Sequence, residues 1–105
     1  NRNGSRRIAI LGDMMELGKQ SKYYHSEIGK EFSKSGIEIL IAIGSSARHI
    51  YLAAKKNADP LRHYYYFKDK ETALKKINTL IKPNDVLLIK ASRSAKLEDV
   101  VQYIV

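Results

Sequence analysis

Two loops of opposite charge hold the residues of this chain that could do chemistry. The first, Leu11-Gly12-Asp13-Met14-Met15-Glu16-Leu17-Gly18, follows the apolar run Arg7–Ile10 and carries two carboxylates between its glycines. Asp13 and Glu16 could orient a substrate ammonium group or a metal-bound water. They could instead cap the turn that follows them, and capping is the commoner use of such residues. The loop, with Gly12 at its start, is a candidate ligand-binding site.

The second loop is Lys90-Ala91-Ser92-Arg93, and it follows the apolar run 86–89. Lys90, Ser92 and Arg93 bring two cations and a hydroxyl to the end of an expected strand and the start of an expected helix. Backbone N–H groups at a helix start add further donors, so this set suits an anion or a carboxylate. An ordinary solvated surface loop has the same composition, and both interpretations stay open at this point.

His25 is the one histidine placed where it could transfer a proton, near the start of an expected helix and on its side toward the sheet. Imidazole titrates near neutral pH and serves as a general acid or base. A buried histidine that packs and forms a hydrogen bond is the commoner case. His25 is therefore a possible site residue only.

Several well-defined site patterns are absent from the sequence. The glycines at 12 and 18 enclose five residues where a phosphate loop has four, and Gln20 stands where that loop needs a magnesium-binding Ser or Thr. No GxGxxG follows the first apolar run, which removes the support for a complete dinucleotide site. With no Cys and three scattered His, no metal site is predicted.

The elements that must position these loops alternate between strands and helices. Apolar runs typical of strands lie at about 6–12, 38–43, 63–67 and 85–90. Helical periodicities lie at about 21–35, 45–57, 70–81 and 95–105, with Ser21, Ser45-Ser46 and Asp69 expected to begin the first three.

Continuous apolar runs such as Ile37–Ile43 indicate strands that are buried on both faces of a parallel sheet. We therefore predict an α/β fold: a Rossmann-like three-layer αβα domain with a mainly parallel sheet of about four strands. Right-handed crossovers place the carboxyl ends of all strands at one edge, where ligands bind in such sheets. Ligand contacts are then expected in the loops 12–18, 44–46, 67–69 and 90–94.

Composition sets further bounds. With 105 residues, we expect residues 6–105 to form one domain, and residues 1–5 to be a linker or the edge of an excised piece. The formal net charge of +8 invites a nucleic-acid interpretation, but the lysines are spread along helical segments, which is typical of solvated helix faces. No run reaches the length of a membrane span and no signal-peptide pattern is present, so we expect a cytoplasmic protein without a membrane partner.

At these same residues the chain resembles the carboxy-terminal domain of the Mur ligases. The resemblance rests on Arg7–Gly18, on His25 with Gly29 four residues later, on Phe67-Lys68-Asp69-Lys70, and on Leu88–Val101. It covers nearly the whole chain in the correct order, and the pairing of a GDMxELG loop with a K-[GA]-S-R loop is specific. Ala91 departs from the glycine of many members.

The resemblance implies a part of an ATP-dependent amide-forming ligase of the bacterial cytoplasm, most similar to the members that add D-Ala-D-Ala to UDP-N-acetylmuramoyl-tripeptide in peptidoglycan synthesis. Such an enzyme has three domains, and the amino-terminal and central ones hold the UDP-sugar, the phosphate loop and Mg²⁺. The third domain helps to position ATP and the dipeptide when the domains close.

The resemblance further implies that Gly12, Asp13, Glu16, Lys90, Ser92 and Arg93 position ATP or substrate. No catalytic residue is expected in this fragment, and the fragment alone is expected to be inactive. The alternative is a self-standing basic α/β module that binds phosphorylated ligands or nucleic acid.

Overall fold

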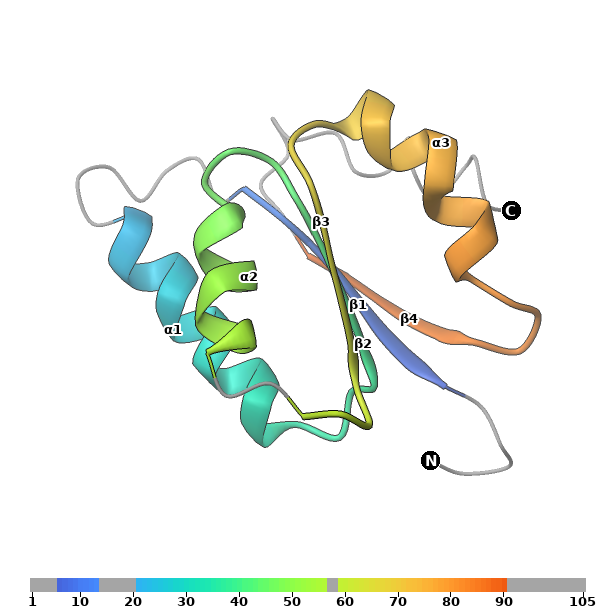
Figure 1. Ribbon diagram of the computed structural model, residues 1–105, viewed down its shortest axis with the longest axis horizontal. Helices are drawn as coiled ribbons and strands as arrows, with labels where there is room; N and C mark the ends of the chain where they lie inside the picture. The colour runs from blue at the N-terminus through green and yellow to red at the C-terminus, as the bar shows by residue number, and fades with distance from the viewer. Residues whose placement is uncertain (1–5, 14–20, 57–58, 91–105) are drawn as a thin grey trace.

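The computed structural model describes residues 6–13, 21–56 and 59–90. In chain order the elements are β1 (Arg7–Gly12), α1 (Ser21–Lys34), β2 (Ile39–Ile43), α2 (Arg48–Lys55), β3 (His63–Phe67), α3 (Lys70–Leu80) and β4 (Val86–Lys90) (Figure 1). The predicted alternation of strands and helices is confirmed over this range. The expected helix at 95–105 lies outside the described residues.

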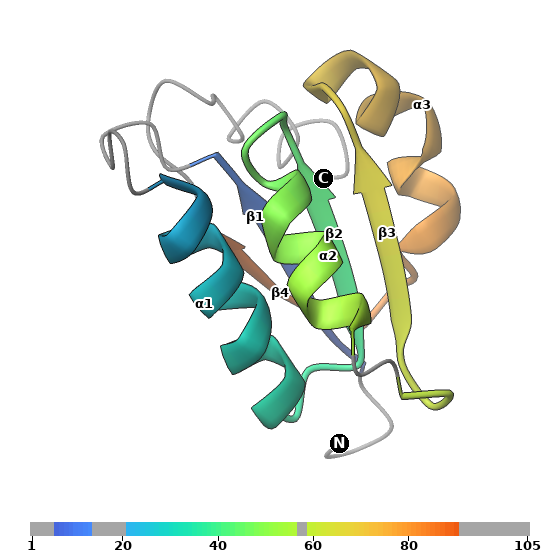
Figure 2. The same ribbon diagram turned by 60° about the vertical axis from the view of Figure 1, so that its left-hand side comes forward.

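The four strands form one parallel sheet in the order β3-β2-β1-β4. The steps from β1 to β2 and from β2 to β3 run the same way across the sheet, and their helices α1 and α2 share one face (Figure 2). The connection from β3 to β4 runs back across the sheet, and its helix α3 lies on the opposite face. This is the arrangement that crossovers of a single hand produce. The predicted α/β fold of three layers is confirmed.

Side chains alternate between the two faces of the sheet. Toward α3, a cluster of isoleucines from β1 and β2 packs against Ala73 and Ile77. Toward α1 and α2, small and medium side chains such as Ala9, Leu40 and Ala42 pack against Phe32 and Ile50. Because β1 and β2 are buried on both faces, they read as continuous apolar runs in the sequence.

A glycine lets the two helices of one face approach closely. A Cβ built on Gly29 of α1 would lie 2.8 Å from the Cβ of Ala53 in α2 and would overlap the Ile50 carbonyl oxygen. Gly29 is therefore a packing residue, and it brings α1 and α2 together over β1 and β2.

The helix starts agree with the sequence in one case and differ in another. Asp69 accepts a hydrogen bond from the Thr72 N–H at 2.7 Å, which confirms it as the N-cap of α3. The second helix was expected to begin at Ser45-Ser46, but α2 begins at Arg48, and its N-cap position, Ala47, has no side-chain cap of its own. The chain before α2 forms a turn instead, and the acceptor for the Ala47 N–H is the side chain of Asp13, the residue after β1.

Candidate functional site

The parallel register brings all four strand ends to one edge. Gly12 pairs with Ile43, Ile43 with Phe67, and Leu11 with Lys90. The chain therefore leaves all four strands at this edge, where ligand sites are expected in open α/β sheets. Of the predicted site residues, the structure places Gly12, Asp13 and Lys90 here, on the neighbouring strand ends of β1 and β4.

Asp13 follows β1 directly and contacts the turn after β2. Its Oδ1 accepts a hydrogen bond of 2.7 Å from the backbone N–H of Ala47, which is buried just before α2. The carboxylate thus serves as a non-local cap for the approach to α2. The sequence suggested a cap on the turn after Asp13, and that turn lies outside the described residues.

Gly44, the residue after β2, lies directly against this carboxylate. Its φ of +121° is in a region that favours glycine. A Cβ built on Gly44 would lie 2.6 Å from Cγ of Asp13 and 2.8 Å from its Oδ2. Any side chain at position 44 would displace the carboxylate, so Gly44 shapes the site by having none.

Tyr66 of β3 completes this group, and the sequence interpretation missed its role. Its hydroxyl donates a hydrogen bond of 3.1 Å to the Gly44 carbonyl, and its ring centroid lies 5.8 Å from that of Tyr51 in α2. Burial raises the pKa of Tyr66; Arg48 opposes this, while Asp13 and Asp69 add to it. The run Tyr64-Tyr65-Tyr66 indicates a strand and nothing more. The one sequence signal for a role of Tyr66 at the site was its position next to the carboxyl end of that strand.

Lys90 ends β4 and is exposed at the same edge. Lys90 pairs with Leu11, and Leu11 stands two residues before Asp13. A cation and a carboxylate therefore lie at the ends of two neighbouring strands. Its predicted partners Ser92 and Arg93, and Glu16 of the acidic loop, lie outside the described residues. An anion site at this edge stays a prediction. Of its three predicted donors, the structure places Lys90.

His25 is fully buried in α1 rather than exposed at the edge. Among the described residues, every buried side-chain nitrogen or oxygen has a hydrogen-bond partner. The pKa of the neighbouring His49 is lowered, chiefly by burial and then by the charges of Lys22, Arg48 and His25. These surroundings favour the packing interpretation of His25, and its role in proton transfer stays a prediction.

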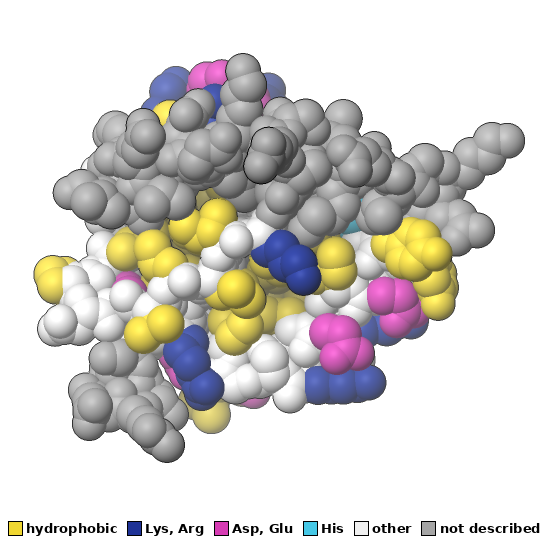
Figure 3. Space-filling model, turned by 180° about the vertical axis from the view of Figure 1, so that it is seen from behind, with side chains coloured by type: hydrophobic (Ala, Val, Ile, Leu, Met, Phe, Trp, Pro, Cys, Tyr) yellow, Lys and Arg dark blue, Asp and Glu magenta, His cyan; other side chains and the backbone are white. Residues whose placement is uncertain are grey.

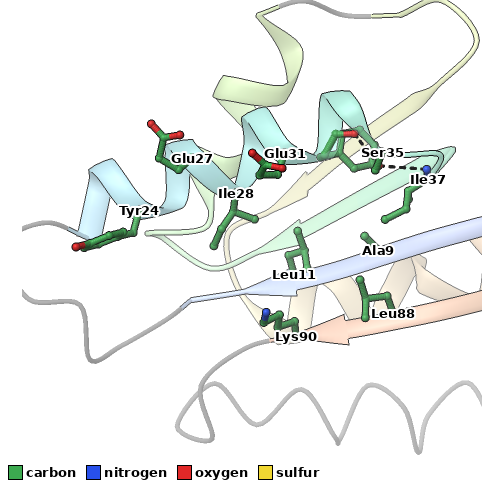
Figure 4. A pocket seen from close by; sticks show the side chains of 11 residues that line it. Ala9, Leu11, Tyr24, Glu27, Ile28, Glu31, Ser35, Ile37, Leu88 and Lys90 are labelled. Carbon is green, nitrogen blue, oxygen red and sulfur yellow. Dashed lines mark hydrogen bonds between the residues drawn. The ribbon is translucent and has the colours of Figure 1, made fainter.

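An apolar groove lies beside the candidate site, between α1 and the strands β1 and β4, with a volume of about 670 Å³. Ala9 and Leu11 form its floor with Leu88, which is 51% exposed, and Lys90 lies at its end (Figure 4). Glu27 and Glu31 of α1 lie along its rim. Figure 3 shows hydrophobic side chains across the middle of the face seen from behind, with basic side chains among and below them and acidic ones toward the lower right. The lining suits an apolar occupant, and the acidic part of the site lies outside it.

The excess of positive charge is distributed as on solvated helices. On α1, Lys30 is paired with Glu27 at 3.4 Å and Lys34 with Glu31 at 3.9 Å, and all four side chains are at least 39% exposed. These i,i+3 pairs neutralise part of the lysine charge of α1, which weakens its attraction for phosphates. The pattern favours a solvated helix face.

In the part of the chain that the structure describes, no three His, Cys, Asp or Glu residues lie together as metal ligands. Within the same residues, no helix is long and apolar enough to cross a membrane. What remains is a parallel α/β domain in which Asp13, Tyr66 and Lys90 lie at the carboxyl edge of the sheet. The fold places the chain in the class of open parallel α/β domains, in which ligands bind at this edge of the sheet.

Comparison with known proteins then gives the family. Residues 1–93 match the family described as "Mur ligase, glutamate ligase domain". The chain therefore belongs to the Mur ligase family, which confirms the resemblance seen in the sequence.

Individual relatives agree. The chain is 34% identical over 99 residues to the UDP-N-acetylmuramoyl-tripeptide--D-alanyl-D-alanine ligase of Buchnera aphidicola (Baizongia pistaciae), covering 94% of this chain and 20% of the relative. It is 31% identical over 98 residues to the ligase of the same name in Escherichia coli K12, covering 91% and 20%. A crystal structure of MurF from Acinetobacter baumannii has a TM-score of 0.80 at 22% identity, covering 94% of this chain and 22% of that chain, and it shows the shared fold. The chain thus spans about one fifth of the length of these relatives.

Proposed function

We propose that this chain is the carboxy-terminal domain of an ATP-dependent ligase that adds D-Ala-D-Ala to UDP-N-acetylmuramoyl-tripeptide in peptidoglycan synthesis. The observation that carries the proposal is the placement of Asp13 and Lys90 on the adjacent strand ends of β1 and β4 in a member of the Mur ligase family. The names of the similar ligases supply the substrate class.

Within this proposal the acidic and basic loops have separate tasks. Asp13, with Gly12 and Glu16, orients ATP or the incoming amine. Lys90, Ser92 and Arg93 bind an anionic group, and the dipeptide carboxylate fits best because cations and backbone N–H groups at a strand end recognise carboxylates. A nucleotide phosphate has the same chemistry and is the second choice for this group.

ATP and Mg²⁺ belong to the proposal only in part. ATP would supply the phosphoryl group that activates the tripeptide carboxylate. The exposed ammonium group of Lys90 fits a supporting contact to a phosphate, whereas no described group of carboxylates fits Mg²⁺. We therefore assign Mg²⁺ and the main ATP contacts to the amino-terminal and central domains of a longer protein in the bacterial cytoplasm, which are this domain's partners.

The test is made in the full-length enzyme that carries this chain. Lys90→Met and Arg93→Met should each raise KM for D-Ala-D-Ala or lower kcat by about tenfold to a hundredfold, because a charge-assisted hydrogen bond contributes about 1.5–3 kcal/mol. Affinity for the UDP-sugar should stay nearly unchanged. Lys76→Met, at an exposed lysine of α3 away from the edge, is the matched control. Unchanged dipeptide and ATP kinetics in both variants would overturn the assignment of the basic loop.

A further inference from the structure

Three strand ends are linked by a continuous set of contacts at the candidate site. The Tyr66 hydroxyl of β3 donates to the carbonyl of Gly44, which follows β2, at 3.1 Å. Gly44 in turn lies against the carboxylate of Asp13, which follows β1. That carboxylate accepts the hydrogen bond from Ala47 at 2.7 Å. The position of the carboxylate therefore depends on the turn at Gly44, and the turn is attached to β3.

β3 holds this turn at two points. The Gly44 N–H donates to the Phe67 carbonyl at 2.9 Å, which continues the ladder between β2 and β3. The second point is the Tyr66 hydroxyl on the Gly44 carbonyl. The first bond fixes the peptide unit before the α-carbon of Gly44, and the second fixes the orientation of the peptide unit after it. Gly44 has no side chain and a φ of +121°, a backbone conformation that glycine adopts readily.

The surroundings of Tyr66 suit this task. Its ring packs against Tyr51, so the hydroxyl is held on a rigid side chain rather than on a mobile one. The pKa of Tyr66 is raised, first by burial, so the hydroxyl keeps the proton that it must donate. A phenylalanine would keep the ring packing and remove only the donor.

We propose that Tyr66 is a positioning residue of the candidate site: through the Gly44 turn it holds the Asp13 carboxylate in the orientation needed to contact ATP or the incoming amine. This inference rests on the proposed function of Asp13. It adds Tyr66, a residue inside β3, to predicted positioning residues that come from the ends of β1 and β4 and the loops after them.

The experiment is a double-mutant cycle in the full-length enzyme with Tyr66→Phe, Asp13→Ala and the combined variant. Tyr66→Phe should change the same kinetic constant as Asp13→Ala, KM or kcat, in the same direction, by about three- to tenfold. In the Asp13→Ala background it should change that constant by less than about twofold, because residues that act through one another are not additive.

The chain offers a matched control on the same strand. The ring of Tyr64 packs against that of Phe32. Its hydroxyl accepts a hydrogen bond of 3.0 Å from the Asp59 N–H at the opposite end of β3. Tyr64→Phe removes the same atom far from the site and should leave both kinetic constants unchanged. Hydrogen–deuterium exchange of a peptide covering residues 44–50 should become faster in Tyr66→Phe and not in Tyr64→Phe, which reports the turn itself.

Each result is decisive. Impaired Asp13→Ala with unchanged Tyr66→Phe would overturn the inference and leave the proposed function of Asp13 intact. A Tyr66→Phe effect of the same size in both backgrounds would show that Tyr66 acts independently of Asp13 and would also overturn it. Unchanged kinetics in Asp13→Ala would refute the role of Asp13, and the inference with it.

Discussion

At the scale of single residues, Asp13 combines a structural task with a proposed chemical one. Its carboxylate caps the turn before α2, and the same group belongs to the acidic loop proposed to orient substrate. The two tasks need different properties of the side chain. The cap needs an oxygen acceptor, which Asn also provides, whereas orienting an ammonium group needs the negative charge.

This difference predicts that two variants of Asp13 differ in stability but lose activity alike. Asp13→Ala should lower the free energy of unfolding by about 0.5–2 kcal/mol through loss of the cap, whereas Asp13→Asn should lower it much less. Ligase activity should fall in both variants, because both lack the charge. Thermal or chemical unfolding and steady-state kinetics, made on the same preparations, provide the measurement. Full activity in Asp13→Asn would show that Asp13 acts only as a cap and does not orient substrate through its charge.

Individual residues also show how far sequence reasoning reaches. Asp13 and Lys90 could be singled out because a polar residue directly after an apolar run marks the end of a strand. The role of Tyr66 could not be found this way, since its hydroxyl meets Gly44, 22 residues away in the sequence. Such a contact depends on which strands are neighbours and in what register, and a local pattern contains neither.

At the scale of elements, the strands were predicted almost to the residue, and the start of α2 was not. The strands follow from burial on both faces, which leaves a continuous apolar run. Ser45-Ser46 has the composition of a helix cap, but Asp13 supplies the acceptor to Ala47 from 34 residues away and the helix begins later, at Arg48. The acceptor for this turn thus comes from a residue distant in the sequence, which a local cap pattern cannot reveal.

The contact between α1 and α2 gives a prediction for Gly29. Gly29→Ala should lower the free energy of unfolding by about 1–3 kcal/mol, although alanine is the better helix former, because its Cβ would meet the Ile50 carbonyl and the Ala53 side chain. Gly36→Ala is the matched control: the nearest atoms to its Cβ would be those of the Arg7 guanidinium, the end of a flexible, 47% exposed side chain, and the expected change is within about 0.5 kcal/mol. Equal losses in the two variants, measured by urea unfolding, would contradict the close packing at Gly29.

At the scale of the whole molecule, an ion pair joins the residue before β1 to the residue before β4. Arg6 donates from Nε to Oδ1 of Asp85 at 3.0 Å and from Nη2 to Oδ2 at 2.7 Å, and it also reaches the Leu80 carbonyl. The Asp85 side chain is only 4% exposed. The hydrogen bond from Arg6 holds the pKa of Asp85 below its usual value, and the bond from the Lys82 N–H adds to this against the cost of burial.

The lowered pKa fixes the sign of the pH dependence. A carboxylate with a lowered folded-state pKa stabilises the protein fully above its unfolded pKa of about 3.9, and this stabilisation is lost as the pH falls through the folded value. Asp85→Asn should cost about 1.5–3 kcal/mol of unfolding free energy at pH 7. The difference between parent and variant should shrink below about pH 4. Urea unfolding at a series of pH values measures it, and a difference independent of pH down to pH 2 would contradict the ion pair.

The last prediction concerns the 105-residue chain as a molecule separate from any partner domain. Phosphoryl transfer needs a phosphate-binding loop and a metal site to position the reacting groups. The sequence contains no phosphate loop, and the described residues contain no metal-ligand group. The isolated chain should therefore show neither ATPase nor ligase activity above a matched blank, while a circular-dichroism spectrum shows it folded. Adding the remaining domains of the ligase as a separate polypeptide is the informative comparison, because activity restored only by this mixture would assign the missing groups to those domains. Turnover by the pure chain, abolished by substitutions within 12–18, would refute the prediction and place complete catalytic machinery in this single domain.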